Sequence, residues 1–105
     1  MFARSVSIRL RTNSVAEFTR VIEKDALPLL RRQKGFQDEL TFVGPGGEAV
    51  AISLWDEKRN ADSYGRNGFP EVLKALSKVA DGTPQVQTFE VCNSTFHKIA
   101  APVGV

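Results

Sequence analysis

The 105-residue sequence predicts an α+β fold in which helices cover one face of an antiparallel sheet. Three observations support this prediction. Several segments alternate apolar and polar residues, which is typical of strands, and two others carry apolar residues at helical spacing. Residues 44–48, Gly-Pro-Gly-Gly-Glu, join two extended segments as a hairpin turn would. The elements follow one another in the order β-α-β-β-α-β.

The first strand and the first helix occupy residues 2–35. From Phe2 to Leu10 the even positions are apolar except for Arg4, which predicts a strand with one arginine in its apolar row. Residues 14–17, Ser-Val-Ala-Glu, have the pattern of a capping box, so a helix should begin there with both outer side chains bonded to free backbone N–H groups. Pro28 should kink this helix or end its regular part near Ala26.

The remaining elements follow after Gly35, which is expected to end the first helix in a left-handed conformation. They are strands over Phe36–Val43 and Ala49–Asp56, a short helix over Lys58–Arg66, a second helix from Pro70 to Ala80, and an extended segment over Gln85–His97. Two β-α-β crossovers place both helices on one face of a four-stranded sheet, which is the ferredoxin-like arrangement. Residues 1–98 are read as one domain and residues 99–105 as a C-terminal tail.

Composition and charge exclude several classes of protein. The net charge is 14 − 12 = +2, and the basic residues form only one cluster, Arg31–Lys34, so we expect neither a nucleic-acid nor a membrane partner. No segment approaches the roughly 18 apolar residues of a membrane helix. The alternating N-terminus does not have the pattern of a signal peptide, and the single cysteine, Cys92, fits a reducing compartment. These observations predict a cytoplasmic protein.

The strand patterns also predict a partner chain. In the segment after the hairpin, one side-chain row is Val50, Ile52 and Leu54, and the other is Ala49, Ala51, Ser53 and Trp55. Neither row carries a charge, although a sheet covered on one side needs a polar open side. A chain of this length has helices for only one face. We therefore predict a homodimer in which two sheets pack face to face.

Short motifs along nearly the whole chain, up to about His97, resemble those of a known family. They are Pro28 followed by residues 32–36 (Arg-Gln-Lys-Gly-Phe), residues 52–56 (Ile-Ser-Leu-Trp-Asp), Ser63-Tyr64, and residues 83–86 (Thr-Pro-Gln-Val) leading into residues 89–91 (Phe-Glu-Val). This pattern is similar to that of the antibiotic biosynthesis monooxygenase (ABM) domain family, in the dimeric α+β barrel superfamily. The resemblance implies a ferredoxin-like domain that pairs with a second copy as such a barrel.

The resemblance also implies an activity, that of a cofactor-independent monooxygenase acting on a small hydroxylated aromatic or quinone-like compound. A deprotonated substrate of that kind can itself donate an electron to dioxygen, so the protein supplies a dry pocket, hydrogen bonds and a base, and neither metal nor flavin is required. Candidate catalytic residues are Tyr64, His97 and Arg4, and candidate substrate-binding residues are Trp55, Asn60, Asn67 and Phe69. The alternatives are a non-catalytic barrel that holds a small apolar or aromatic ligand as a sensor or carrier, and a structural dimer without a cavity.

Most candidates have a structural alternative. Trp55 can serve core or dimer packing, Arg4 can bridge a carboxylate at the sheet edge, and His97 can be an exposed residue without function. The predicted helices 58–66 and 70–80 contain no histidine, which disfavours the haem-degrading branch of the family. One histidine and one cysteine cannot build a nitrogen- or sulfur-rich metal site, so no metal is expected.

Overall fold

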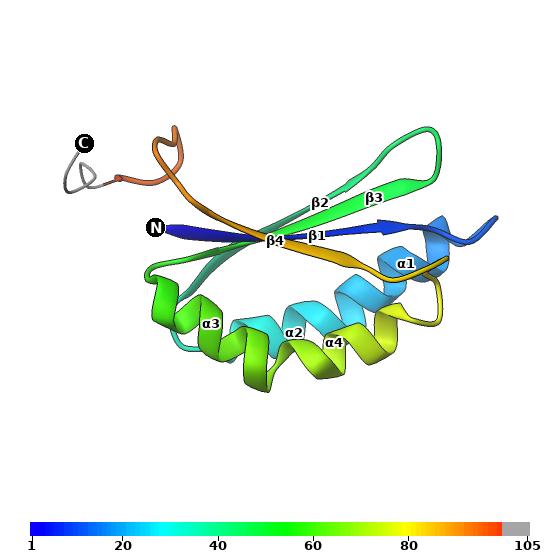
Figure 1. The fold of residues 1–105 in the computed structure, drawn as a ribbon, viewed down its shortest axis with the longest axis horizontal. Coiled ribbons are helices and arrows are strands. Elements are labelled where there is room, and N and C mark those ends of the chain that lie inside the picture. The colour runs from blue at the N-terminus through cyan, green and yellow to red at the C-terminus, as the bar shows by residue number, and fades with distance from the viewer. Residues whose placement is uncertain (100–105) are drawn as a thin grey trace.

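The computed structural model describes residues 1–99 and has two layers, a sheet and a set of helices on one side of it (Figure 1). The strands are β1 (Phe2–Arg9), β2 (Phe36–Val43), β3 (Glu48–Trp55) and β4 (Gln85–Glu90). The helices are α1 (Val15–Val21), the π-helical turn η1 (Ile22–Ala26), α2 (Leu27–Arg31), α3 (Lys58–Asn67) and α4 (Phe69–Leu76). Among the described residues, no helix is long and apolar enough to cross a membrane.

The sheet has the strand order β2-β3-β1-β4, and every neighbouring pair is antiparallel. The strand that starts the chain therefore lies inside the sheet, between β3 and the last strand. This topology confirms the ferredoxin-like fold and the antiparallel four-stranded sheet predicted from the sequence. The predicted hairpin is also present, with β2 and β3 paired from Phe36↔Trp55 to Val43↔Ala49.

A π-helical turn precedes Pro28 in the first helical segment. The Leu27 N–H donates to the Ile22 carbonyl, five residues back, and Pro28 follows in the first turn of α2. Proline has no N–H to donate, so the widened turn lets the chain continue in one direction past it. The regular α-helical part therefore ends at Val21, five residues before the predicted Ala26, and the α-helix resumes at Leu27. Gly35 has the left-handed conformation expected of it, with φ +83°, but the helix already ends at Arg31.

Three further local predictions are wrong. The helix does begin after Ser14, but this residue makes no side-chain capping bond, because its backbone (φ −105°, ψ 5°) lacks the extended conformation of a capping residue. Glu17 instead pairs with Arg20 at 2.5 Å. The last strand ends at Glu90 rather than His97, because its pairing with β1 ends at Phe2↔Glu90 and continues only as one hydrogen bond from the Val91 N–H to the Met1 carbonyl. Helix α4 ends at Leu76, four residues before the predicted Ala80.

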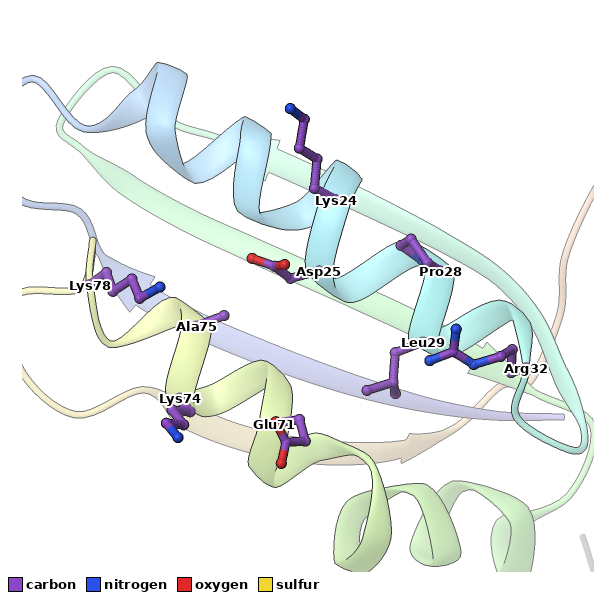
Figure 2. Close-up of a pocket in the computed structure, with 9 residues that line it drawn as sticks. All are labelled: Lys24, Asp25, Pro28, Leu29, Arg32, Glu71, Lys74, Ala75 and Lys78. Atoms are coloured by element: carbon purple, nitrogen blue, oxygen red, sulfur yellow. The ribbon is translucent and has the colours of Figure 1, made fainter.

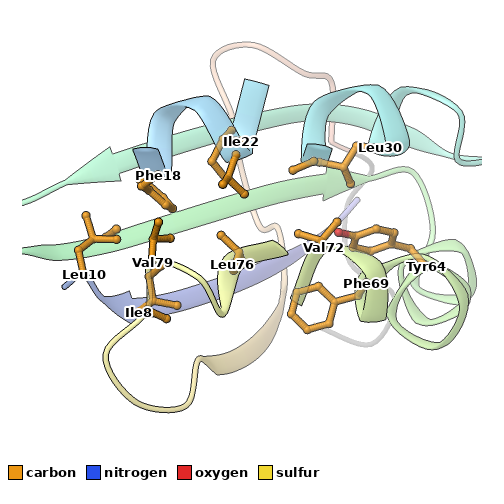
Figure 3. Packing of buried hydrophobic residues seen from close by; sticks show 14 of the residues in the cluster. Ile8, Leu10, Phe18, Ile22, Leu30, Tyr64, Phe69, Val72, Leu76 and Val79 are labelled. Atoms are coloured by element: carbon orange, nitrogen blue, oxygen red, sulfur yellow. The ribbon is translucent and has the colours of Figure 1, made fainter. Parts of the chain in front are cut away.

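The hydrophobic core lies between the helices and the face of the sheet that we call the inner face (Figure 3). Trp55 and Phe18 are the largest fully buried side chains in it. The helices and strands between Phe2 and Glu90 form these two layers, and the predicted tail, 99–105, lies outside the described residues except for its first residue. The opposite face, which we call the open face, has no helix over it among the described residues (Figure 1).

The open face carries a group of large apolar side chains that we call the apolar patch. Its members alternate along three strands: Leu40 and Phe42 on β2, Val50, Ile52 and Leu54 on β3, and Phe89 on β4. Phe42 and Phe89 are 52% and 51% exposed. Residues of this kind normally lie inside a protein. The uncharged side-chain row noted in the sequence of β3 therefore forms part of an exposed apolar surface.

Candidate functional site

Four polar residues form one row across the inner face of the sheet. Glu39 on β2 pairs with Ser53 on β3, Ser53 pairs with Arg4 on β1, and Arg4 pairs with Thr88 on β4. Residues paired directly across an antiparallel sheet point to the same side. We call these four residues the polar row. It crosses a face that is otherwise mostly apolar, and the residues on either side of it include Trp55, Val6 and Ala51.

A β-bulge places Glu39 in this row. The pairing of β2 with β3 moves from Phe36↔Trp55 to Asp38↔Leu54, so two residues of β2 oppose one of β3. The extra residue reverses the alternation of side chains that follows it. Phe36 and Glu39 consequently share the inner face although their positions differ by an odd number, and Leu40 and Phe42 turn to the open face.

The Arg4 guanidinium lies inside the domain, between the sheet and helices α3 and α4. Arg4 is 7% exposed, and its Cζ lies 5.0 Å from the centre of the Phe69 ring and 5.5 Å from that of Tyr64. Gly65 makes room for it, because a Cβ there would be 2.6 Å from Arg4 Nη1. Arg4 forms no ion pair with any described residue, and its Nε is a buried donor without a hydrogen-bond partner. The predicted alternative, a bridge at the sheet edge, is wrong because β1 is an inner strand.

Aromatic side chains pack beside the polar row. Tyr64 stacks on Trp55 with ring centres 5.0 Å apart, and Phe69 meets Tyr64 edge-on at 6.1 Å. Trp55 is fully buried and donates from its Nε1 to the Ser53 hydroxyl at 2.9 Å. Trp55 therefore serves core packing and orients Ser53. The Tyr64 hydroxyl points toward Val72, into the space between the helices and the sheet (Figure 3).

The polar row and these aromatic residues border an interior cavity of about 30 Å³. Its lining includes Arg4, Glu39, Ser53, Tyr64 and Phe69 together with aliphatic side chains of the helices and the sheet: Val6, Ile22, Ala26, Leu30, Ala51, Val72 and Leu76. This is room for water but not for a larger ligand. The structure thus brings together three of the predicted site residues, Arg4, Tyr64 and Phe69, around this cavity.

Burial shifts the acid–base behaviour of three groups around this cavity. It raises the pKa of Glu39 above its usual value, against the effect of the hydrogen bond that Thr41 donates at 2.5 Å. It raises the pKa of Tyr64 to about 12, a rise that Arg4 opposes and Glu39 reinforces. It lowers the pKa of Arg4, with Tyr64 and Asp62 acting in the opposite direction. An arginine stays cationic under such a shift, so the site combines a cation, a neutral phenol and a readily protonated carboxylate.

The other predicted site residues lie elsewhere. Asn60 donates to Asp56 at 2.8 Å and packs against Gly35, where it joins α3 to the start of β2. Asn67 is exposed at the end of α3 and donates to Ser63 at 3.3 Å. His97 lies on the open side of the sheet, hydrogen-bonded to Asp38. It borders a surface hollow of about 270 Å³ with Asp38, Glu39, Leu40, Leu54 and Phe96.

A larger groove of about 510 Å³ runs between the two helical segments on the side facing away from the sheet (Figure 2). Lys24 and Arg32 line it from the first segment, and Glu71, Lys74 and Lys78 line it from α4 and the turn after it. None of the residues predicted as catalytic or substrate-binding borders this groove. Its lining is that of a solvated surface between two amphipathic helices.

Sequence reasoning missed Glu39 and Ser53. Ser53 was visible as the one hydroxyl in an apolar row of β3. Glu39 had no comparable signal, since uninterrupted alternation from Phe36 places it on the opposite face. Among residues 1–99, no group of three histidine, cysteine or carboxylate side chains is placed to hold a metal ion.

Comparison with known proteins gives structural matches only. No family model matches the chain, and no curated protein matches it. A protein of unknown function from Nitrosomonas europaea superimposes with a TM-score of 0.75 at 14% identity, over 96% of this chain and 95% of the other. SnoaB, a cofactor-independent oxygenase from Streptomyces nogalater, gives 0.72 at 20% identity, over 90% and 95%.

A third structure carries the name that the sequence motifs indicated. A protein from Bordetella bronchiseptica assigned to the antibiotic biosynthesis monooxygenases gives a TM-score of 0.72 at 19% identity, over 86% of this chain and 95% of the other. Identities this low establish a shared fold. Because proteins assigned to the ABM group share it, the structural match supports the ABM-like assignment made from the sequence.

Proposed function

We propose that this protein is a cofactor-independent monooxygenase acting on a small hydroxylated aromatic or quinone-like compound. One observation carries the proposal: Arg4, Glu39 and Tyr64 converge on an otherwise apolar cavity between the sheet and the helices. A buried cation, a carboxylate with a raised pKa and a phenolic donor are what deprotonation of an aromatic hydroxyl in a dry site requires. The ABM-like fold and the oxygenase among its structural neighbours support the same reading.

The proposed reaction balances without a resident cofactor. A base removes the hydroxyl proton of a naphthol-type substrate, and the anion transfers one electron to dioxygen. The resulting radical and superoxide combine at a ring carbon, where a C–O bond forms to give a peroxide anion, and the base returns its proton to that anion to give a hydroperoxide. Loss of the proton on that carbon and cleavage of the O–O bond yield a quinone and water, so one oxygen atom enters the product and the other leaves as water. Tyr64, neutral because of its high pKa, donates a hydrogen bond to an oxygen of the substrate.

The cavity must enlarge to accept such a substrate. Pockets for small organic ligands measure about 300–1,000 Å³, whereas this cavity measures about 30 Å³. The side chains that close it on the helix side include Phe69, Val72 and Leu76, all on the eight-residue helix α4. We propose that displacement of α4 and the Phe69 ring opens the site.

Oxygen uptake by the purified, metal-free protein tests the proposed function. The protein is incubated with 1-naphthol, anthrone and a quinol series, and uptake is compared with that of Tyr64→Phe and with that of the protein-free solution. We expect uptake above the uncatalysed rate and about 10-fold or more slower uptake in Tyr64→Phe, because loss of a donor to a developing anion weakens transition-state binding. Ligand binding without any oxygen uptake would replace the proposal with a non-catalytic sensor or carrier.

We also propose that two chains pair through their open faces to form an α+β barrel. The apolar patch supports this pairing, because its side chains lie on the face that no helix covers among the described residues. Removing such a patch from water stabilises association by roughly 25 cal/mol per Å². The hollow beside His97 opens on the same side, so pairing also buries that residue's surroundings.

A further inference from the structure

We infer that Glu39 is the base that accepts the substrate proton, and that the Arg4 Nε–H binds the oxygen on which negative charge then develops. This inference rests on the proposed function and assigns its two central roles. It also defines the substrate more narrowly, as a ring compound whose acidic hydroxyl is conjugated to a second oxygen on its far side.

The first observation that supports this inference is the position of the two residues in the polar row. Glu39 and Arg4 pair with the same residue, Ser53, from opposite sides, so exactly one strand separates them. Neighbouring strands lie about 4.8 Å apart, which puts the two Cα atoms roughly 10 Å from each other. Both side chains border one cavity, yet no ion pair joins them. A carboxylate and a guanidinium held apart in this way leave space between them for a ligand.

The second observation is that the Nε of Arg4 has no hydrogen-bond partner. It is the buried side-chain nitrogen or oxygen that lacks a hydrogen-bond partner among the described residues. A buried donor left unpaired costs about 1–3 kcal/mol, more when it is charged. The surrounding rings of Tyr64 and Phe69 present their faces and supply no acceptor oxygen at this nitrogen. An anionic ligand oxygen would provide the acceptor that the protein does not.

The third observation concerns the hydrogen bonds made to the Glu39 carboxylate. Thr41 donates to one carboxylate oxygen, Oε2, and no hydrogen bond from a described residue reaches the other. That second oxygen is free to accept a proton from a ligand in the cavity. Burial favours the protonated form of the carboxyl, which increases its strength as a base toward a phenol.

Proton and charge balance across the row. The hydroxyl proton moves to Glu39, which becomes a neutral acid. The electron pair of the broken O–H bond delocalises through the ring to the conjugated oxygen beside Arg4. The net charge of the site is thus unchanged, and the Arg4 guanidinium now contacts a negatively charged oxygen of the ligand. After the C–O bond forms, Glu39 returns its proton to the peroxide anion.

A binding experiment with 4-hydroxybenzaldehyde tests these roles without turnover. Its hydroxyl and conjugated carbonyl lie at opposite ends of one ring, and its anion absorbs at longer wavelength than the neutral form. The probe is titrated with protein at a pH below its own pKa, and proton release is followed with a pH indicator. We expect the bound probe to show the anion spectrum without releasing a proton to solvent, because Glu39 takes it up.

Three variants complete the experiment. Glu39→Gln should bind the probe in its neutral form and lower oxygen uptake about 10²–10⁴-fold. Arg4→Gln should also lose the anion spectrum, with at least 10-fold weaker probe binding. The matched control is Glu48→Gln, which removes an exposed carboxylate on the neighbouring strand and should behave as the wild type does. Circular dichroism confirms that each variant is folded before it is titrated.

The outcomes separate the inference from the proposed function. A neutral bound probe in the wild type, or an anion spectrum unchanged in Glu39→Gln, would overturn the inference even if oxygen uptake were observed. An anion spectrum that depends on both residues, with no oxygen uptake from any tested compound, would leave the assigned roles in place and reject the monooxygenase function.

Discussion

Each face of the sheet carries residues that are unusual for its position: polar residues in the core on one face, and exposed apolar residues on the other. The inner face, which the helices cover, carries Arg4, Glu39 and Ser53 in one row. The open face carries the apolar patch, with phenylalanine rings about half exposed. A single chain stabilised on its own would keep its charged residues in water and would not expose a group of large apolar side chains.

Each face departs from the usual distribution of polar and apolar residues for a different reason. Charged residues under the helices cost stability, so they mark a place where the fold serves a ligand. Apolar residues on the open face cost nothing to the fold of one chain, so they mark a surface that serves association. Stability, association and chemistry are therefore expected to respond to different substitutions on the two faces.

The largest expected effect is on stability and comes from the inner face. Trp55→Ala removes a fully buried side chain that stacks on Tyr64, and we expect it to lower the free energy of unfolding by about 3–5 kcal/mol. Phe96→Ala, on the open side and 82% exposed, should change it by less than about 0.5 kcal/mol. Urea unfolding measures both. Equal losses of stability in the two variants would show that the core does not lie on the inner face.

The next effect is on association and comes from the open face. Phe42→Asp places a charge in the apolar patch and should weaken the dimer by about 2 kcal/mol or more, roughly 30-fold. Val15→Asp is the control, because Val15 is 47% exposed, close to the 52% of Phe42, but lies on α1. Sedimentation of both variants across a concentration series gives the result. A wild-type chain that stays monomeric at micromolar concentration would reject the pairing.

The smallest effect concerns the stability cost of the polar row. The pKa of Glu39 is higher in the folded state than in the unfolded state. The protonated carboxyl therefore contributes its full stability below the unfolded-state pKa. This contribution is lost as pH rises through the folded-state pKa, because the folded protein must then hold a charged carboxylate. Glu39→Gln stays neutral, so it should match the wild type near pH ~4 and be more stable near pH ~7. Unfolding at both pH values measures the difference, and Glu48→Gln should show no comparable change with pH. A Glu39→Gln variant less stable at neutral pH would mean that the ionised carboxylate supports the fold.

Much of the fold could be predicted because its signals are local. Alternation identified β1, the spacing of apolar residues identified both helical segments, and Gly35 and Pro28 fall where the backbone needs them. The capping box failed since a four-residue pattern does not determine the backbone angles of Ser14. The end of β4 was missed because it depends on where its partner strand begins.

The candidate site could be predicted only in part. Arg4 stood out as a charge in an apolar row, and Tyr64 and Phe69 were candidates through the family resemblance. Glu39 was not, because a bulge is a property of two paired strands and has no signature in one of them. The separation of His97 from the cavity follows from the turn of the chain after β4, which pattern reasoning extended as a strand.

The bulge also determines how β2 tolerates changes in length. In a regular strand, deleting one residue turns every later side chain to the other face. Deleting Gln37, the unpaired residue between Phe36 and Asp38, would instead leave Phe36 and Glu39 on the same side and restore a regular ladder. Descendants of this sequence can therefore lose one codon at this position and keep both faces intact, and a one-residue gap in β2 between relatives would preserve the orientation of the side chains that follow.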